Sequence, residues 1–214
     1  MWRIRGATFC VTRLLRNRNS KITEVSMITV VSGTNRKGSR CKVFAQQYFE
    51  FLREALGEEE VKFLALEDIP QEWLSADMYA PEGQHPELTV IQDEYVLPAR
   101  GFVFVSPEYN GSYPGVLKLF IDACSIREYA KNFKGKKAAL LGVASGRAGN
   151  LRGMSHLAGV LHYLGTTTMP DQLPISQISN LLDENNHIVD EDTLDVMRTH
   201  AQAFSRFVYE GSLV

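Results

Sequence analysis

The chain has 214 residues, which is long enough for one well-packed domain and short for two. Its net charge of -2 gives no sign of a nucleic-acid or anionic-lipid partner, since those partners call for a strong basic surplus. With 44% hydrophobic and 22% charged residues the composition is that of a globular protein, and no apolar run approaches the roughly 20 residues that span a bilayer.

The three cysteines constrain the compartment and the metal chemistry. Cys10, Cys41 and Cys124 are odd in number, widely spaced, and lack a C-x-x-C pair or a nearby histidine cluster. This pattern predicts a reducing, cytoplasmic location and no metal site.

The first 26 residues differ in charge from the rest of the chain. They hold six of the 23 Lys and Arg residues but one of the 25 Asp and Glu residues. Such a basic start is compatible with a targeting segment, or with a start codon assigned upstream of Met27, which directly precedes the first predicted strand. We predict that residues 1–26 are a basic N-terminal extension outside the fold and that residues 27–214 form one domain.

From Met27 onward, short β-branched runs alternate with longer stretches of helical periodicity, which predicts a parallel sheet with helices on both faces. The apolar runs predict five strands, at about residues 28–32, 61–66, 102–105, 138–143 and 166–169. Helical stripes fall at about residues 41–55, 88–95, 114–121, 151–164 and 194–208. The connection formed by residues 67–86 is long enough to be either disordered or functional, for instance as a cover over a ligand.

A loop with a phosphate-binding pattern follows the first strand. Residues 32–40 read SGTNRKGSR, close to the triphosphate-binding pattern G-x-x-x-x-G-K-[S/T], but Ser39 stands where that pattern has its lysine. Helix N-terminal amides, the hydroxyls of Thr34 and Ser39 and the guanidinium of Arg36 together suit a terminal monophosphate held without metal. The other interpretation is a tight glycine turn whose basic side chains lie in solvent.

Two further loops follow the third and fourth predicted strands. Residues 106–114 read SPEYNGSYP, and residues 144–150 read ASGRAGN. Ligands of an open parallel sheet bind beyond the carboxyl ends of the strands, so turn formers and aromatics there indicate a ligand-facing role. Glycines in residues 144–150 would let the backbone approach a flat ring closely. The other interpretation of residues 106–114 is a proline-rich turn ahead of a helix.

One monophosphate site and two loops able to flank a planar ring describe a pocket for flavin mononucleotide (FMN). The segments SGTNRKGSR, VSPEYNGSYPGVLKLFIDA and GVASGRAGNLRG, in this order, resemble the NADPH-dependent FMN reductase family of flavodoxin-like proteins, which includes quinone, azo-dye and chromate reductases. The resemblance covers residues 27–165 and extends loosely to the last strand and helix. It implies an α/β, flavodoxin-like three-layer sandwich with a five-stranded parallel sheet in the order 2-1-3-4-5. It also implies FMN as cofactor, NADPH or NADH as co-substrate, and a homodimer or homotetramer.

The resemblance further implies which residues bind the cofactor. The phosphate would be bound by Thr34, Arg36 and Ser39, with Arg40 beside them. The isoalloxazine ring would pack along Pro107, Glu108, Tyr109, Asn110 and Gly111. The other edge of the ring would meet Ser145, Gly146, Arg147 and Gly149. Cys41 departs from the family, which often has Asn at this position, and no acid–base side chain or metal ligand is expected.

With FMN bound, the flavin performs the chemistry and the protein supplies orientation and electrostatics. We predict an NAD(P)H-dependent reductase that passes hydride from nicotinamide C4 to flavin N5 and on to a small-molecule acceptor such as a quinone, with ping-pong kinetics. Two other functions stay open: a flavodoxin-like electron carrier without nicotinamide turnover of its own, and a flavin-free regulatory or scaffold protein. The sequence does not select the physiological acceptor, nor NADH over NADPH.

Overall fold

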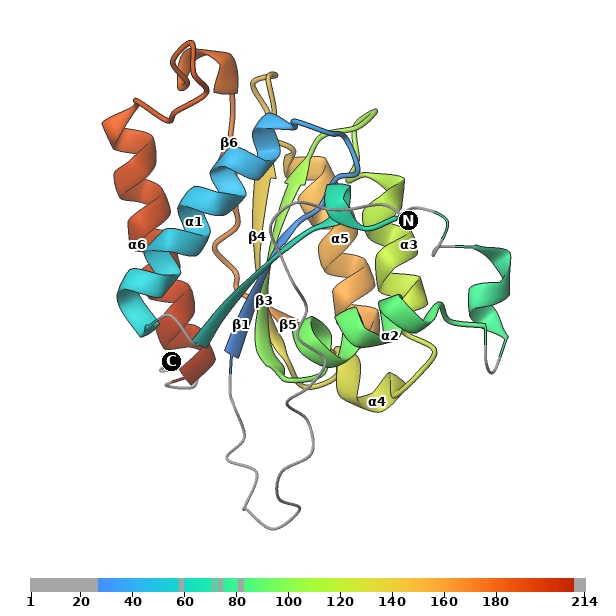
Figure 1. Cartoon of the computed structure of the whole chain (residues 1–214). Coiled ribbons are helices and arrows are strands. Elements are labelled where there is room, and N and C mark those ends of the chain that lie inside the picture. The colour runs from blue at the N-terminus through green and yellow to red at the C-terminus, as the bar shows by residue number, and fades with distance from the viewer. Residues whose placement is uncertain (1–26, 58–59, 71, 73–74, 81–82, 210–214) are drawn as a thin grey trace, which may run out of the picture.

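The structure is a computed structural model of the chain, and it describes residues 27–57, 60–70, 72, 75–80 and 83–209. The predicted basic extension, residues 1–26, lies outside the described residues. At the centre is a parallel sheet with helices on both faces, so the described part of the chain has three layers (Figure 1).

The sheet confirms the predicted strand order. Its strands are β1 (Met27–Ser32), β2 (Val61–Ala65), β3 (Ala99–Pro107), β4 (Lys137–Val143), β5 (Thr167–Thr168) and β6 (Leu173–Ile175). They are parallel and lie in the order β2-β1-β3-β4-β5, and β6 also pairs with β4. The predicted fifth strand is observed as the short β5, which pairs with the start of β4; β6, which pairs with the end of β4, was not predicted. Pro170 lies between β5 and β6, and it has no amide hydrogen to donate to a continuous ladder.

The helices lie close to where the periodicity predicts them. They are α1 (Arg40–Leu56), α2 (Pro86–Ile91), α3 (Gly115–Ala123), α4 (Tyr129–Asn132), α5 (Leu151–Tyr163) and α6 (Glu191–Tyr209). Shorter turns are the 3-10 helices η3 (Leu66–Asp68), η5 (Ala76–Tyr79) and η7 (Ile178–Asn180), and the π-helix η6 (Gln92–Val96), which continues α2. Helices α1 and α6 cover one face of the sheet, and α2, α3 and α5 cover the other (Figure 1).

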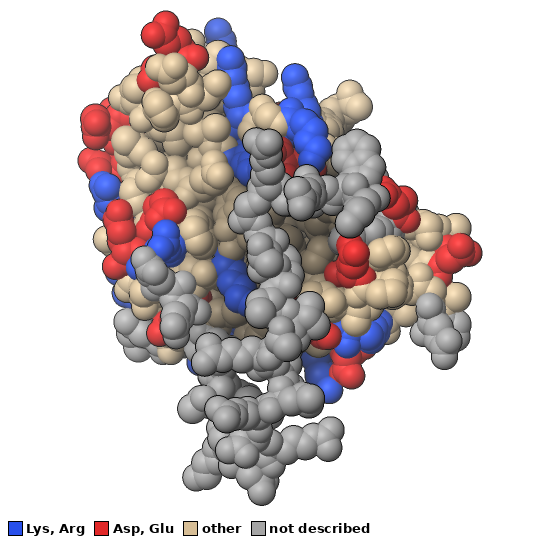
Figure 2. Space-filling view, in the orientation of Figure 1, with Lys and Arg blue, Asp and Glu red and all other residues tan. Residues whose placement is uncertain are grey.

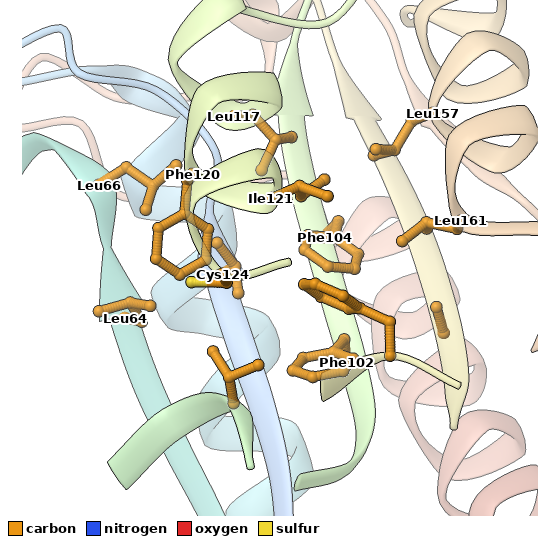
Figure 3. Packing of buried hydrophobic residues seen from close by; sticks show 14 of the residues in the cluster. Leu64, Leu66, Phe102, Phe104, Leu117, Phe120, Ile121, Cys124, Leu157 and Leu161 are labelled. Atoms are coloured by element: carbon orange, nitrogen blue, oxygen red, sulfur yellow. The ribbon is translucent and has the colours of Figure 1, made fainter. Parts of the chain in front are cut away.

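Strand β3 shows how the sheet builds two cores. Successive side chains of a strand point to opposite faces. Phe102 and Phe104 therefore join the core on the α2, α3 and α5 side, while Val103 and Val105 join the core on the α1 and α6 side. Figure 3 shows the two phenylalanines between side chains of α3 and α5. Burial on both faces accounts for the unbroken apolar run of this strand.

The described part of the long connection after β2 is anchored in the core. Leu66 and Met78 are each 1% exposed, and Ile69 is 6% exposed. All three belong to the cluster that also contains Phe102 and Phe104. These residues are therefore ordered, which speaks against the disordered interpretation for the described part of the connection.

A buried histidine joins α6 to α1. The Nε2 atom of His200 lies 2.9 Å from the carbonyl oxygen of Asp171, and Nδ1 lies 2.8 Å from the hydroxyl of Tyr48. A carbonyl oxygen accepts but cannot donate, so Nε2 carries the hydrogen and Nδ1 accepts from Tyr48. Burial lowers the pKa of His200 below its ordinary value of 6.5, against the weaker upward effect of Asp171.

This histidine makes the stability depend on pH. Below pH 6.5 the imidazole of the unfolded chain takes up a proton that the buried imidazole resists, so the free energy of unfolding falls as the pH is lowered. Urea denaturation measures the free energy of unfolding at each pH. Between pH 8 and pH 5 we expect this free energy to fall less for His200→Gln than for the native chain. The matched control is His162→Gln on the exposed face of α5, which keeps the native slope. Equal slopes for the native chain and His200→Gln would contradict the assignment.

Candidate functional site

Three loops meet at the carboxyl ends of the strands and enclose a cavity of about 600 Å³. Loop 1 (residues 33–39) joins β1 to α1, loop 2 (108–114) joins β3 to α3, and loop 3 (144–150) joins β4 to α5. We call this space the edge cavity. Its volume lies within the roughly 300–1,000 Å³ of small-molecule sites.

The edge cavity brings together most of the predicted cofactor residues. Ten of the thirteen line it: Arg36, Ser39, Arg40, Pro107, Glu108, Tyr109, Asn110, Gly111, Ser145 and Gly146. The lining does not include Thr34, Arg147 or Gly149. Arg147 is exposed, whereas Thr34 and Gly149 are buried between chain segments.

Loop 1 is hydrogen-bonded to the sheet at its first residue, and its last residue caps α1. The amide of Gly33 donates to the carbonyl of Val105 at 2.8 Å, and a Cβ atom at Gly33 would lie 2.9 Å from Leu117 Cδ2. Gly38 has a φ of 66°, which favours glycine, and Ser39 caps α1 by accepting from the amide of Cys41 at 3.3 Å. The N-terminus of α1 thus lies at the edge cavity, and the amide groups of a first helical turn bind anions in many proteins.

The cations of loop 1 and α1 fall into two groups. Lys42 forms ion pairs with Glu67 at 2.8 Å and Asp68 at 3.0 Å, and Lys37 donates to the carbonyl of Glu67. Burial acts to lower the pKa of Lys42, but the two carboxylates outweigh it and raise that pKa above 10.5. The two carboxylates neutralise Lys42, and Lys37 ties loop 1 to η3.

The two arginines that line the edge cavity have no acidic partner among the described residues. Arg36 and Arg40 are both exposed, and Arg40 Nη1 donates to the hydroxyl of Ser179 at 3.0 Å. Figure 2 shows Lys and Arg side chains standing at the upper edge of the molecule, above the carboxyl ends of the strands in Figure 1. The positive charge left over at the edge cavity favours an anionic ligand.

Loop 2 closes in a tight turn that presents Tyr109. The amide of Tyr109 donates to the carbonyl of Ser112 at 2.8 Å, and the amide of Ser112 donates back at 3.1 Å. Between them Asn110 and Gly111 have φ values of 52° and 77°, as a two-residue turn of this type requires. The hydroxyl of Tyr109 lies 2.7 Å from that of Thr34, so loop 2 is bonded to loop 1.

Asn150 bonds loop 3 to the end of β3. It is 1% exposed, with a left-handed φ of 62°. Its Nδ2 atom donates to the carbonyls of Ser106 and Pro107, each at 3.0 Å. From the sequence, Asn150 is the last residue of the third loop and has no predicted role; its place directly before a helix was the available signal.

The small residues of loop 3 serve chain packing as well as the cavity. A Cβ atom at Gly149, whose φ is 54°, would lie 2.6 Å from Pro174 Cβ, so this glycine lets β6 approach the loop. A Cβ atom at Gly142 would lie 2.0 Å from the carbonyl oxygen of Gly149. By contrast, Gly146 has open space at its Cβ position and faces the edge cavity. Gly149 thus packs against β6, whereas the sequence predicts that it contacts the isoalloxazine ring.

The lining also contains residues that the sequence analysis did not select. They are Gly38, Cys41, Val143, Ala144 and Ile178. The thiol of Cys41 donates to the carbonyl of Val105 at 3.4 Å, and burial raises its pKa far above the ordinary value, so it is an unreactive thiol. Ile178 comes from η7, and no local pattern links it to the three loops.

The described residues hold neither a metal-ligand cluster nor a membrane-spanning helix. They contain no group of three or more His, Cys, Asp or Glu side chains placed to hold a metal ion. Within the same part of the chain, no helix is both long and apolar enough to cross a bilayer.

Residues 26–180 match the family model of the NADPH-dependent FMN reductases. The chain belongs to this family. Relatives include a 2-hydroxy-1,4-benzoquinone reductase from Burkholderia sp., 32% identical over 59% of this chain and 70% of that protein, and a quinone reductase from Escherichia coli K12, 30% identical over 87% and 97%. The predicted family and oxidoreductase class are confirmed, and the family supports FMN with NADPH or NADH as cofactors.

Solved structures support the fold of this family member. The flavoenzyme NAD(P)H:(acceptor) oxidoreductase FerB from Paracoccus denitrificans is 24% identical, with a TM-score of 0.68 over 88% of this chain and 99% of its own. An archaeal flavodoxin is 15% identical, with a TM-score of 0.51 over 86% and 98%. The predicted flavodoxin-like fold is confirmed.

Removal of the Asn150 amide tests the link between loop 3 and β3. Asn150→Ala leaves two buried carbonyls without their donor, so we expect the free energy of unfolding to fall by about 1–3 kcal/mol. Urea denaturation of the apoprotein measures this change. Asn185→Ala, in an exposed turn, is the control and should cost far less. An equal fall in the free energy of unfolding in the two variants would show that the hydrogen bonds of Asn150 do not stabilise the fold.

Proposed function

We propose that the chain binds FMN in the edge cavity and uses NADPH or NADH to reduce small-molecule acceptors, quinones foremost. The observation that supports this most is the combination, in one cavity with loops 2 and 3, of a helix N-terminus with Arg36 and Arg40, which have no acidic partner in the described part of the chain. The names of the Burkholderia and E. coli relatives favour a quinone acceptor.

The residues present fit the two ends of FMN. A singly esterified phosphate is a dianion, which suits the amides of the first turn of α1 and the two arginine side chains without metal. Ser39 accepts a hydrogen bond as the cap of α1, so its own hydroxyl hydrogen stays available to a phosphate oxygen. At the other end, the open backbone at Gly146 leaves space for a flat ring.

When bound, FMN would supply the redox chemistry, a hydride transfer from nicotinamide C4 to flavin N5 and on to the acceptor in ping-pong order. The protein residues bind and orient the reactants. Two histidines of α5 contact hydroxyls that do not line the edge cavity: His156 Nδ1 lies 2.9 Å from the hydroxyl of Ser112, and His162 Nε2 lies 2.7 Å from that of Thr168. We assign no acid–base role to either.

Assembly and location form part of the same proposal. We propose a homodimer or homotetramer, as the sequence resemblance implies. The described cysteines, Cys41 and Cys124, are both free thiols, which supports a reducing compartment such as the cytoplasm.

Arg36→Ala tests the phosphate assignment. Loss of a charged hydrogen bond should weaken FMN binding by about 1.5 to 3 kcal/mol, and the fold should persist because Arg36 is exposed. Titration calorimetry of the apoprotein with FMN measures the affinity, and circular dichroism checks the fold. Arg100→Ala, exposed at the opposite end of β3, is the control and keeps native affinity. Unchanged affinity in Arg36→Ala would remove Arg36 from the phosphate site.

Turnover separates the reductase from the electron carrier. We expect purified protein with FMN to oxidise NADPH or NADH when a quinone is added, with parallel lines in double-reciprocal plots at several quinone concentrations. This pattern follows if both substrates use the edge cavity in turn. A yellow protein that oxidises neither nucleotide would instead support the flavodoxin-like carrier. A colourless protein that takes up no FMN would support the flavin-free function.

A further inference from the structure

The hydroxyl of Thr34 lies beneath the edge cavity and does not line it. Thr34 is fully buried. The backbone amide of Arg36 donates to Thr34 Oγ1 at 3.2 Å, and Tyr109 Oη lies 2.7 Å from the same oxygen. One side-chain oxygen thus contacts both the loop that carries Arg36 and the loop that carries Tyr109.

The distance between the two hydroxyls allows either to be the donor, and their other hydrogen bonds favour Thr34. Thr34 Oγ1 already accepts from the Arg36 amide, and its own hydrogen needs an acceptor because the group is buried. Among the described residues, Tyr109 Oη is the acceptor within reach. A buried hydroxyl hydrogen left without an acceptor loses its solvation without replacement, which favours Thr34 as the donor and Tyr109 as the acceptor.

If Thr34 donates to Tyr109, the hydrogen of the Tyr109 hydroxyl is free to bond another acceptor. Tyr109 is half-buried and lines the edge cavity. A phenol that accepts one hydrogen bond also becomes a stronger donor of its own hydrogen, since bonds in a chain polarise one another. The ordered donor is therefore available to an acceptor atom of a molecule in the cavity.

We propose that Thr34 is a positioning residue that holds Tyr109 as a hydrogen-bond donor to an oxygen of bound FMN. The proposal rests on the proposed function, and it replaces direct phosphate contact by Thr34 with action through Tyr109. The same Thr34 oxygen also accepts from the Arg36 amide, so the two hydrogen bonds hold loop 1 and loop 2 at a defined distance from each other.

Four variants test the proposal by FMN affinity of the apoprotein. Tyr109→Phe removes the donor and should weaken binding about tenfold, equal to about 1.4 kcal/mol. Thr34→Val keeps the shape but removes the hydroxyl, and should weaken binding several-fold, whereas Thr34→Ser retains the hydroxyl and restores affinity. The double variant Thr34→Val with Tyr109→Phe should bind no worse than Tyr109→Phe alone, because both changes remove one interaction.

Thr166→Val is the matched control for a purely structural effect. Thr166 is also buried, and its hydroxyl donates to the carbonyl of Phe133 at 2.8 Å, just before β5 at the other end of the sheet. It should lose stability as Thr34→Val does, yet keep native FMN affinity. If the native chain binds FMN while Thr34→Val and Tyr109→Phe bind it equally well, the positioning role is overturned and the proposed function stands. If the native chain binds no FMN, the proposed function itself fails.

Discussion

The register of the parallel sheet is the constraint on which the site depends. Ser32, the last residue of β1, pairs with Val105 of β3, and Ser106 pairs with Gly142 of β4. Three neighbouring strands therefore end at nearly the same height, and the loops that follow them start side by side. A shift of one residue in either pairing would move a loop away from the others and turn the strand's side chains to the wrong face.

Specific hydrogen bonds then hold the three loops together, and charge selects what they bind. Loop 1 is bonded to β3 by the backbone amide of Gly33 and to loop 2 by the hydroxyl of Thr34. Loop 3 is bonded to the end of β3 by the side-chain amide of Asn150. Ion pairs with Glu67 and Asp68 neutralise Lys42, while Arg36 and Arg40 line the edge cavity with no acidic partner among the described residues. The molecule thus separates cations that hold the loop from cations that face the cavity.

Much of this arrangement could be predicted because it is local in the sequence. Short apolar runs between helical stripes indicate strands, and the glycines of residues 32–40 indicate a loop between a strand and a helix; that this loop binds a phosphate stays a prediction. Tertiary features escaped prediction: Ile178 reaches the cavity from η7, Gly149 packs on Pro174, and the hydroxyl of Thr34 bonds Tyr109, which lies 75 residues away. Such partners depend on how loops meet in space, which periodicity does not report.

The central claim is that loop 1 and the first turn of α1 bind a monophosphate without metal. The most direct test is calorimetric titration of the apoprotein with FMN and with riboflavin, in buffer that contains EDTA. If two charged hydrogen bonds of about 1.5 kcal/mol each reach the phosphate, FMN binds about 100-fold more tightly than riboflavin, and EDTA changes neither affinity. Equal affinities for the two flavins, or FMN binding that EDTA abolishes, would contradict the account.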